Sequence, residues 1–389
     1  MTYELILSDA RIVTPDTTIE HGWLGVAGGA IAAVEPGDAP EESGEVRPLG
    51  GAWLGPGFID IHVHGSVGID VMDTDEAGLR RLSRFFATRG VTSYLVGTYT
   101  LDHQGTLQAL QTVRGVLGPV TGGASILGVY MEGPYLNPLR KGAHRESLLR
   151  AVDRDEVQEY LDSGVVRAVA FAPELPDADW LTAKLVENGI SPVAGHTDAT
   201  FADMKSAQEA GAVSATHVFN GMRGIHHREP GAAGAALLLD DLVCEVIADG
   251  THIAPQLMKL FWRMKGAQGI ALITDAGPFG GRPDGVYEAF DREVTIKDGV
   301  GRLDDGTISS SAKTFDHDFA LFSRVTAAPF DAVWPAASAV PARIAGVADR
   351  KGSIEVGKDA DLVVLDREGT VLGTVVGGEW IEPGTEQTA

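Results

Sequence analysis

Short apolar runs alternate with amphipathic stretches through the middle of the chain, and this alternation restricts the fold more than any other feature. The runs are rich in β-branched residues and predict strands at 58–64, 92–98, 126–132, 166–172, 192–196, 212–217, 243–248 and 270–275. Between them, apolar residues at helical spacing predict helices at 76–89, 107–117, 178–188, 202–210 and 255–265. Eight strands with intervening helices favour a (β/α)₈ barrel of the TIM type. An open, doubly wound sheet is the alternative, because the number of strands alone does not show closure.

The two ends of the chain have a different residue pattern from its middle. Residues 1–53 and 353–389 hold short apolar segments interrupted by Gly, Asp and Pro, which is typical of strands and turns. We therefore expect one small β-domain built from 1–53 and 353–389, and a barrel domain over 54–352.

Charge and cysteine content exclude several classes of protein. The chain has 31 Lys and Arg against 54 Asp and Glu, a net charge of −23 at pH 7, which argues against nucleic-acid and anionic-membrane partners. The single Cys244 rules out an intramolecular disulfide and a four-cysteine zinc site. The first residues lack a basic, apolar leader, and the most apolar stretch, 232–239, is far shorter than the ~18 residues of a membrane span. We expect a soluble cytoplasmic protein.

Histidines and carboxylates collect where the expected strands end, which is the functional face of such a barrel. His62 and His64 lie two apart on one strand, so their side chains share a face. Imidazole and carboxylate together suit Zn²⁺ or Fe²⁺. The alternative for His62 and His64 is a surface strand with two chance histidines. Glu132 alone is equally a metal ligand or a loop-capping acid, while His196 and His217 alone are each more often core histidines. As a set they predict a metal site with ligands His62, His64, Glu132, His196 and His217.

Two further strand ends suggest a reaction and a substrate group. Asp275 follows the last strand, where a carboxylate next to a metal-activated water can accept a proton and pass it to a leaving group. A helix cap or a metal ligand is the alternative. The loop after His217 reads GMRGIHHREPG, and its Arg228 together with His252 suits a phosphate or carboxylate. A solvated surface loop is the alternative for this segment.

These motifs, in this order and spacing, resemble the amidohydrolase superfamily and, within it, the N-acetylglucosamine-6-phosphate deacetylases. The matching segments are PGFIDIHVHG, MEGPYLNP, KGAH, GHTDAT, THVFNGM, HHREPG, ADGTH and TDA. The resemblance implies a barrel with a small β-sandwich domain, in a hydrolase of amino sugar metabolism. Such an enzyme converts N-acetyl-D-glucosamine 6-phosphate to D-glucosamine 6-phosphate and acetate. A deacetylase of another amino sugar phosphate, such as N-acetylgalactosamine 6-phosphate, a related amidohydrolase or a non-catalytic scaffold is the alternative.

The resemblance also implies roles for single residues. Glu132, His196 and His217 match the ligands of the principal divalent ion, while His62 and His64 match a pair that holds a second ion. One or two ions per subunit are therefore expected, with Zn²⁺ favoured over Fe²⁺, Mn²⁺ or Co²⁺. Asp275 matches the catalytic acid/base of the family, and His144 matches the residue that polarises the substrate carbonyl. Matched substrate contacts are Ala143, Asn220, Gly221, Arg228 and His252.

The resemblance assigns the phosphate to Arg228 and His252, with Arg228 reaching the active site of the neighbouring subunit in a homodimer. One segment departs from the family. In GTISSSAKT, Ile308, Ser309 and Ser310 stand where many relatives have Leu-Ala-Gly. We expect these three residues to contact the substrate, and the two added hydroxyls to narrow or re-polarise that edge of the pocket.

Overall fold

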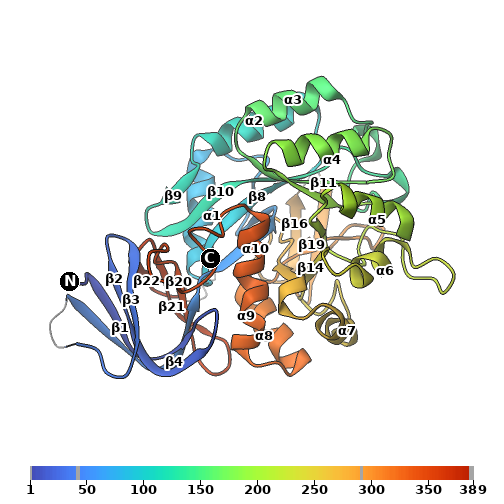
Figure 1. Cartoon of the computed structure of the whole chain (residues 1–389). Helices are drawn as coiled ribbons and strands as arrows, with labels where there is room; N and C mark the ends of the chain where they lie inside the picture. Colours follow the sequence, from blue (N-terminus) through green and yellow to red (C-terminus); the bar gives the residue numbers. More distant parts are fainter. Residues whose placement is uncertain (1, 41–43, 290–291, 385–389) are drawn as a thin grey trace.

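The computed structural model describes residues 2–40, 44–289 and 292–384. Figure 1 shows a barrel surrounded by helices, with a sheet formed by both chain ends packed at its side. Within the described residues, no helix has both the length and the apolar character needed to cross a bilayer.

Eight parallel strands form the barrel, and each is paired with the next. They are β5 (Phe58–Val63), β8 (Val91–Thr98), β10 (Gly123–Glu132), β11 (Val166–Phe171), β12 (Ser191–Ala194), β13 (Ser214–Ala215), β14 (Val243–Ile247) and β15 (Ile270–Ile273). The first and last strands meet just past β15, where Asp275 N donates to His62 O at 2.9 Å and His64 N to Ala276 O at 2.8 Å. The predicted barrel is confirmed, and the open sheet is wrong.

Helices cover the outside of the barrel. They are α1 (Glu76–Ala87), α2 (His103–Arg114), α3 (Arg154–Asp162), α4 (Ala178–Glu187), α5 (Phe201–Ala210), α6 (Gly231–Leu238), α7 (Pro255–Lys265), α8 (Phe315–Thr326), α9 (Phe330–Ala337) and α10 (Ala339–Ile344). The five predicted helices are present. Helices α3, α6 and α8 to α10 were not predicted. Helix α6 illustrates the reason, because its sequence GAAGAALL is buried almost all round and has no polar face to give a helical period.

Strands from both chain ends form one seven-stranded sheet, as the sequence predicted. Its order is β22 (Glu379–Ile381), β21 (Val371–Val376), β20 (Leu362–Leu365), β4 (Glu45–Pro56), β1 (Leu5–Val13), β2 (Thr18–Ala27) and β3 (Ala30–Pro36). The antiparallel pairing of β20 with β4 joins the last part of the chain to the first. Leu7, Leu24, Leu54, Leu362 and Val375 lie in the core that these strands share.

The junction between this sheet and the barrel depends on close packing at the start of β5. Trp334 Nε1 donates to Pro56 O at 2.8 Å, and the indole lies over Gly55. A Cβ at Gly55 would come within 2.1 Å of a carbon of that ring, so only glycine fits there. Trp334 also packs on Phe58, with ring centroids 6.2 Å apart. This contact fixes the entry of the strand that carries His62 and His64.

A four-stranded antiparallel sheet, for which the sequence gives no repeating signal, is inserted between β15 and α8. Its strands are β16 (Gly285–Ala289), β17 (Arg292–Lys297), β18 (Val300–Arg302) and β19 (Ile308–Ser311). Phe279, Val294, Ile296 and Ala312 form a small core of their own beneath it. Shorter strands are β6 (Gly65–Ser66), β7 (Ile69–Asp70) and β9 (Gly118–Val120).

Candidate metal centre and active site

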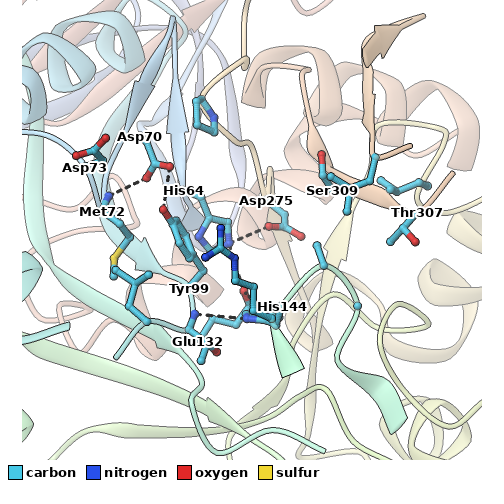
Figure 2. A pocket seen from close by; sticks show the side chains of 18 of the residues that line it. His64, Asp70, Met72, Asp73, Tyr99, Glu132, His144, Asp275, Thr307 and Ser309 are labelled. Atoms are coloured by element: carbon cyan, nitrogen blue, oxygen red, sulfur yellow. Dashed lines mark hydrogen bonds and ion pairs between the residues drawn. The ribbon is translucent and has the colours of Figure 1, made fainter. Parts of the chain in front are cut away.

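The ends of the barrel strands surround a cavity of about 1010 Å³. His64, Glu132, His196, His217 and Asp275 line it, each at or just after the carboxyl end of a strand. Figure 2 shows Glu132, His144 and His64 close together at one side of this cavity, with Asp275 between them and Thr307 and Ser309. The structure therefore brings together groups that are far apart in the sequence.

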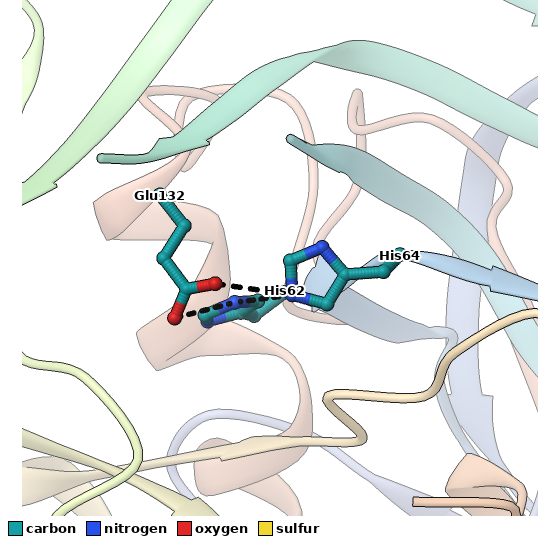
Figure 3. Close-up of side chains that lie close together, drawn as sticks. All are labelled: His62, His64 and Glu132. Atoms are coloured by element: carbon teal, nitrogen blue, oxygen red, sulfur yellow. Dashed lines mark hydrogen bonds and ion pairs between the residues drawn. The ribbon is translucent and has the colours of Figure 1, made fainter. Parts of the chain in front are cut away.

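Glu132 is the centre of the cluster. Its Oε1 lies 2.8 Å from His217 Nε2 and 3.0 Å from His196 Nε2. On the other side, His64 Nε2 is 3.4 Å from Glu132 Oε2, and His62 Nε2 is 3.7 Å from Oε1. Figure 3 shows the two rings of this second group facing the carboxylate. Glu132 thus belongs to two possible metal-binding groups, one with His196 and His217 and one with His62 and His64.

The hydrogen bonds behind the rings show that this donor set fits a cation. The Nδ1 atoms of His64 and His196 each lie 2.8 Å from a backbone carbonyl, of Gly97 and Arg140 respectively, and that of His217 lies 3.2 Å from Asn220 O. A carbonyl accepts only from an N–H, so a neutral ring keeps the lone pair on Nε2. Lone pairs and a carboxylate that face one another repel, unless a cation lies among them. This arrangement is typical of metal-ligating histidines.

His144 has the opposite arrangement. Its Nδ1 accepts the backbone N–H of Thr100 at 3.4 Å, so the neutral ring carries its hydrogen on Nε2. That Nε2 lies 3.3 Å from Glu132 Oε2. Burial lowers the pKa of His144 and outweighs the effect of Glu132, which favours the neutral ring. His144 is therefore a hydrogen-bond donor in the cavity, unlike the rings around it.

Asp275 lies next to the histidine pair on strand β5. Its Oδ1 is 3.1 Å from His64 Nε2 and 3.8 Å from His62 Nε2. Burial by itself would raise the pKa of Asp275, but the two rings, when protonated, hold that pKa at about 2. The pKa of Glu132 is likewise held well below its usual range against burial, by His144, which donates a hydrogen bond, and by protonated His62 and His196. A cation among neutral rings would act on both carboxylates in the same direction, so both are ionised at neutral pH.

The backbone at these strand ends adopts a conformation that L-residues seldom take. The φ angles are 45° at His196, 26° at His217 and 48° at Asp275. Left-handed backbone at non-glycine residues costs on the order of 1–3 kcal/mol each and is concentrated at functional sites. Gly221 has a φ of 56°, and a Cβ there would lie 2.8 Å from His196 Nδ1. The loop after β13 must therefore have glycine at this position to pass next to the ring.

The structure places most of the other predicted substrate contacts on the cavity wall. They are Ala143, Asn220, Gly221, His252, Ile308 and Ser309. Ser310 is different, because its side chain is buried on the side of Gly277 and it is not among the described residues that line the cavity. The expected contact of Ser310 with the substrate stays a prediction.

Arg228 also lies outside the cavity of its own chain, as far as the described residues show. It is exposed, and its guanidinium lies 2.6 Å from His227 Nε2 in the loop before α6. Arg228 therefore lies on the molecular surface. The predicted role in a neighbouring subunit stays a prediction.

Several residues at the site were missed. Tyr99 and Thr100 follow β8 directly, so the same strand-end rule that found the histidines could have found them. Thr216 Oγ1 lies 3.0 Å from His62 Nδ1, and nothing in its sequence context indicates this contact. Glu288 and Leu303 line the cavity from the inserted sheet, which was itself not predicted.

Comparison with known proteins identifies similar chains. Residues 53–278 and 318–381 match the amidohydrolase family. The chain is 35% identical to an N-acetylglucosamine-6-phosphate deacetylase of Bacillus subtilis over 97% of both chains. It is 36% identical to an N-acetylgalactosamine-6-phosphate deacetylase of Escherichia coli over 93% of this chain and 95% of that one.

A solved structure shows the same architecture. A mutant N-acetyl-D-glucosamine-6-phosphate deacetylase from Mycobacterium smegmatis, in complex with N-acetyl-D-glucosamine-6-phosphate, has a TM-score of 0.88 and 33% identity to this chain. The match covers 97% of this chain and 98% of that one. The similarity therefore includes the barrel, the inserted sheet and the sheet from the chain ends.

Proposed function

We propose that this chain, which belongs to the amidohydrolase family, hydrolyses the acetamide of N-acetyl-D-glucosamine 6-phosphate to D-glucosamine 6-phosphate and acetate. One observation carries the proposal: Glu132 contacts His196 and His217 at 3.0 and 2.8 Å in a chain that matches such deacetylases over nearly its whole length. The relative that acts on N-acetylgalactosamine 6-phosphate is about as similar, so this sugar is the second candidate substrate.

The metal ligands would be Glu132, His196 and His217 for a principal divalent ion, with His62 and His64 for a second. We propose Zn²⁺, since imidazole and carboxylate suit it, while Fe²⁺, Mn²⁺ and Co²⁺ accept the same ligands. When bound, such an ion supplies Lewis-acid chemistry, polarising a carbonyl and lowering the pKa of water.

The chain's own residues carry the proton and position the amide. Asp275 is ionised, so it accepts a proton as the oxygen of water forms a bond with the acetyl carbon. The C–N bond then breaks, and Asp275 returns the proton to the amine nitrogen. His144, which carries its hydrogen on Nε2, donates to the carbonyl oxygen as negative charge develops there.

The sugar lies against Ala143, Asn220, Gly221, Ile308 and Ser309 in this proposal, with its phosphate at His252. We keep Arg228 as a second phosphate contact that comes from the other subunit of a homodimer. Its exposure, away from the cavity of its own chain, supports this assignment. A cytoplasmic location stays a prediction from the sequence.

Acetate release tests the function directly. Purified protein is depleted of metal and restored with single divalent ions, then given N-acetylglucosamine 6-phosphate, N-acetylgalactosamine 6-phosphate and unphosphorylated N-acetylglucosamine. We expect metal-dependent release from a phosphorylated sugar and a much lower kcat/KM without the phosphate. Equal rates with and without phosphate would contradict the phosphate assignment. Release of acetate from none of the three sugars would overturn the proposed function.

A further inference from the structure

A buried aspartate lies behind the histidine assigned to the substrate phosphate. His252 lines the cavity, and its Nδ1 is 2.7 Å from Asp249 Oδ2. The Asp249 side chain is fully buried, and that of His252 is 5% exposed. Asp249 has no role in the function proposed above, although its carboxylate bonds directly to a proposed substrate contact.

The loop after β14 fixes the geometry of this pair. Asp249 Oδ1 accepts the backbone N–H groups of Thr251 at 2.8 Å and His252 at 2.9 Å. The other oxygen of Asp249, Oδ2, accepts from the imidazole of His252. Because Nδ1 is turned toward Asp249, Nε2 is the ring nitrogen left to face the cavity. The carboxylate therefore fixes both the loop and the direction of the ring.

The pair also favours a charged imidazole. Burial by itself lowers the pKa of His252, but Asp249, and to a smaller extent Asp275, raise the pKa above its ordinary value of 6.5. Arg302 of β18 acts in the opposite direction. The pKa of Asp249 is lowered by His252 despite burial. A charged imidazole adds the attraction of opposite charges to its hydrogen bond with an anionic oxygen, so this pair suits a phosphate.

We propose that Asp249 is a positioning residue for the deacetylation reaction: it acts through His252, holding Nδ1 and directing Nε2–H into the cavity toward the substrate phosphate. This inference rests on the proposed function. The opposing explanation is a purely structural one, in which Asp249 only caps its own loop. The two explanations differ in whether the effect of Asp249 depends on His252.

The Asp249→Asn variant removes the negative charge of residue 249 but keeps the hydrogen bonds by which its side chain caps the loop. Its amide oxygen still accepts the two backbone N–H groups, while its NH₂ group faces His252 Nδ1 and removes the stabilisation of the protonated ring. We expect KM for the phosphorylated sugar to rise about tenfold, the difference between a charged and a neutral hydrogen bond. Since only binding to a remote group is lost, kcat should stay within about twofold. Asp241→Asn, an exposed acid just before β14, is the matched control and should leave both constants unchanged.

A double-mutant cycle provides the decisive result. If Asp249 acts through His252, Asp249→Asn adds no further rise in KM to a His252→Gln variant. A rise of the same size in both backgrounds, or an unchanged KM in Asp249→Asn alone, would overturn the inference. These outcomes require a wild type that releases acetate. A wild type without turnover counts instead against the proposed function.

A second measurement does not depend on the folding of Asp249→Asn. In the wild type, KM should stay low until the pH is above 6.5 and then rise as His252 loses its proton. This rise should be absent from His252→Gln, in which nothing at that position titrates. A wild-type profile that matches that of His252→Gln would overturn the inference.

Discussion

Replacing Asp275 by Asn separates proton transfer from metal binding. Asn has the shape of Asp but does not accept a proton. The neighbouring rings of His62 and His64, when protonated, hold the pKa of Asp275 at about 2, and a cation at these rings would act in the same direction. The wild-type carboxylate is therefore ionised and ready to accept a proton at neutral pH. The variant therefore lacks this one chemical step while most of its contacts remain.

The expected loss of kcat follows from the role of Asp275 as a general acid/base. A positioned acid/base group contributes about 10²–10⁴-fold to a rate, which corresponds to about 2.7–5.4 kcal/mol of activation free energy. We expect kcat to fall by this factor. The contacts of Glu132 with His196 and His217 do not involve Asp275, so the content of the principal metal should be retained. The backbone bond from Asp275 N to His62 O also remains, so the barrel should stay closed.

Acetate release, metal analysis and thermal unfolding together check this prediction. Asp73→Asn is the matched control, because Asp73 also lines the cavity and loses the same charge. It should leave kcat nearly unchanged. An Asp275→Asn enzyme that kept more than about a tenth of wild-type kcat would refute the acid/base role. A folded variant that lost the principal metal would show instead that Asp275 is a ligand.

Three further changes test the metal and the stability of the fold. Removing divalent ions with a chelator should abolish acetate release and lower the Tm, because an ion bound only by the folded state stabilises it; full activity of metal-free protein would contradict this. Lys351→Met leaves the buried Asp361 carboxylate without its cation. The free energy of unfolding, measured in urea, should therefore fall by about 3–5 kcal/mol. A loss below about 1 kcal/mol would contradict a buried ion pair. Arg223, and then Arg140, lower the pKa of Asp198 to about 2. The ionised carboxylate therefore stabilises the folded state. This stabilisation is fully present above the unfolded pKa of about 4 and is lost as the pH falls toward 2. Asp198→Asn should therefore lower the Tm at pH 7 and match the wild type near pH 2, whereas a difference of equal size at both pH values would exclude this ion pair as the cause.

The architecture could be predicted because the barrel repeats one simple pattern. Apolar, β-branched runs such as β8 alternate in the sequence with amphipathic helices such as α1, whose buried residues recur at helical spacing. The pattern was lost where an element is apolar on every side, as in α6, or very short. The predicted strand over 212–217 is only Ser214–Ala215 in the structure, since the backbone leaves the ladder before His217 reaches its left-handed φ of 26°. Domain boundaries at 53/54 and 352/353 stay predictions.

The inserted sheet shows a second limit. Strands β16 to β19 pair with one another and lie between two barrel elements, so no repeat signals them. Glu288, Leu303 and Ser309 reach the cavity from this sheet, and the orientation of Ser309 against Ser310 depends on the register of β19. The motif suggested three substrate contacts in a row, but it did not show that Ile308 and Ser309 line the cavity while Ser310 is buried beside Gly277.

The roles of the histidines show most clearly why a motif identifies residue types but not their chemistry. Ligand rings and the donor ring have the same side chain, and what distinguishes them is the backbone group at Nδ1. Carbonyls of Gly97, Arg140 and Asn220 leave Nε2 lone pairs free for a cation, whereas the N–H of Thr100 leaves a hydrogen on His144 Nε2. Three of these four backbone groups, those of Gly97, Arg140 and Thr100, lie far from their histidine in the sequence. The same reasoning gives Asp249 its proposed role, because a carboxylate behind Nδ1 makes the third kind of histidine, one that keeps its charge.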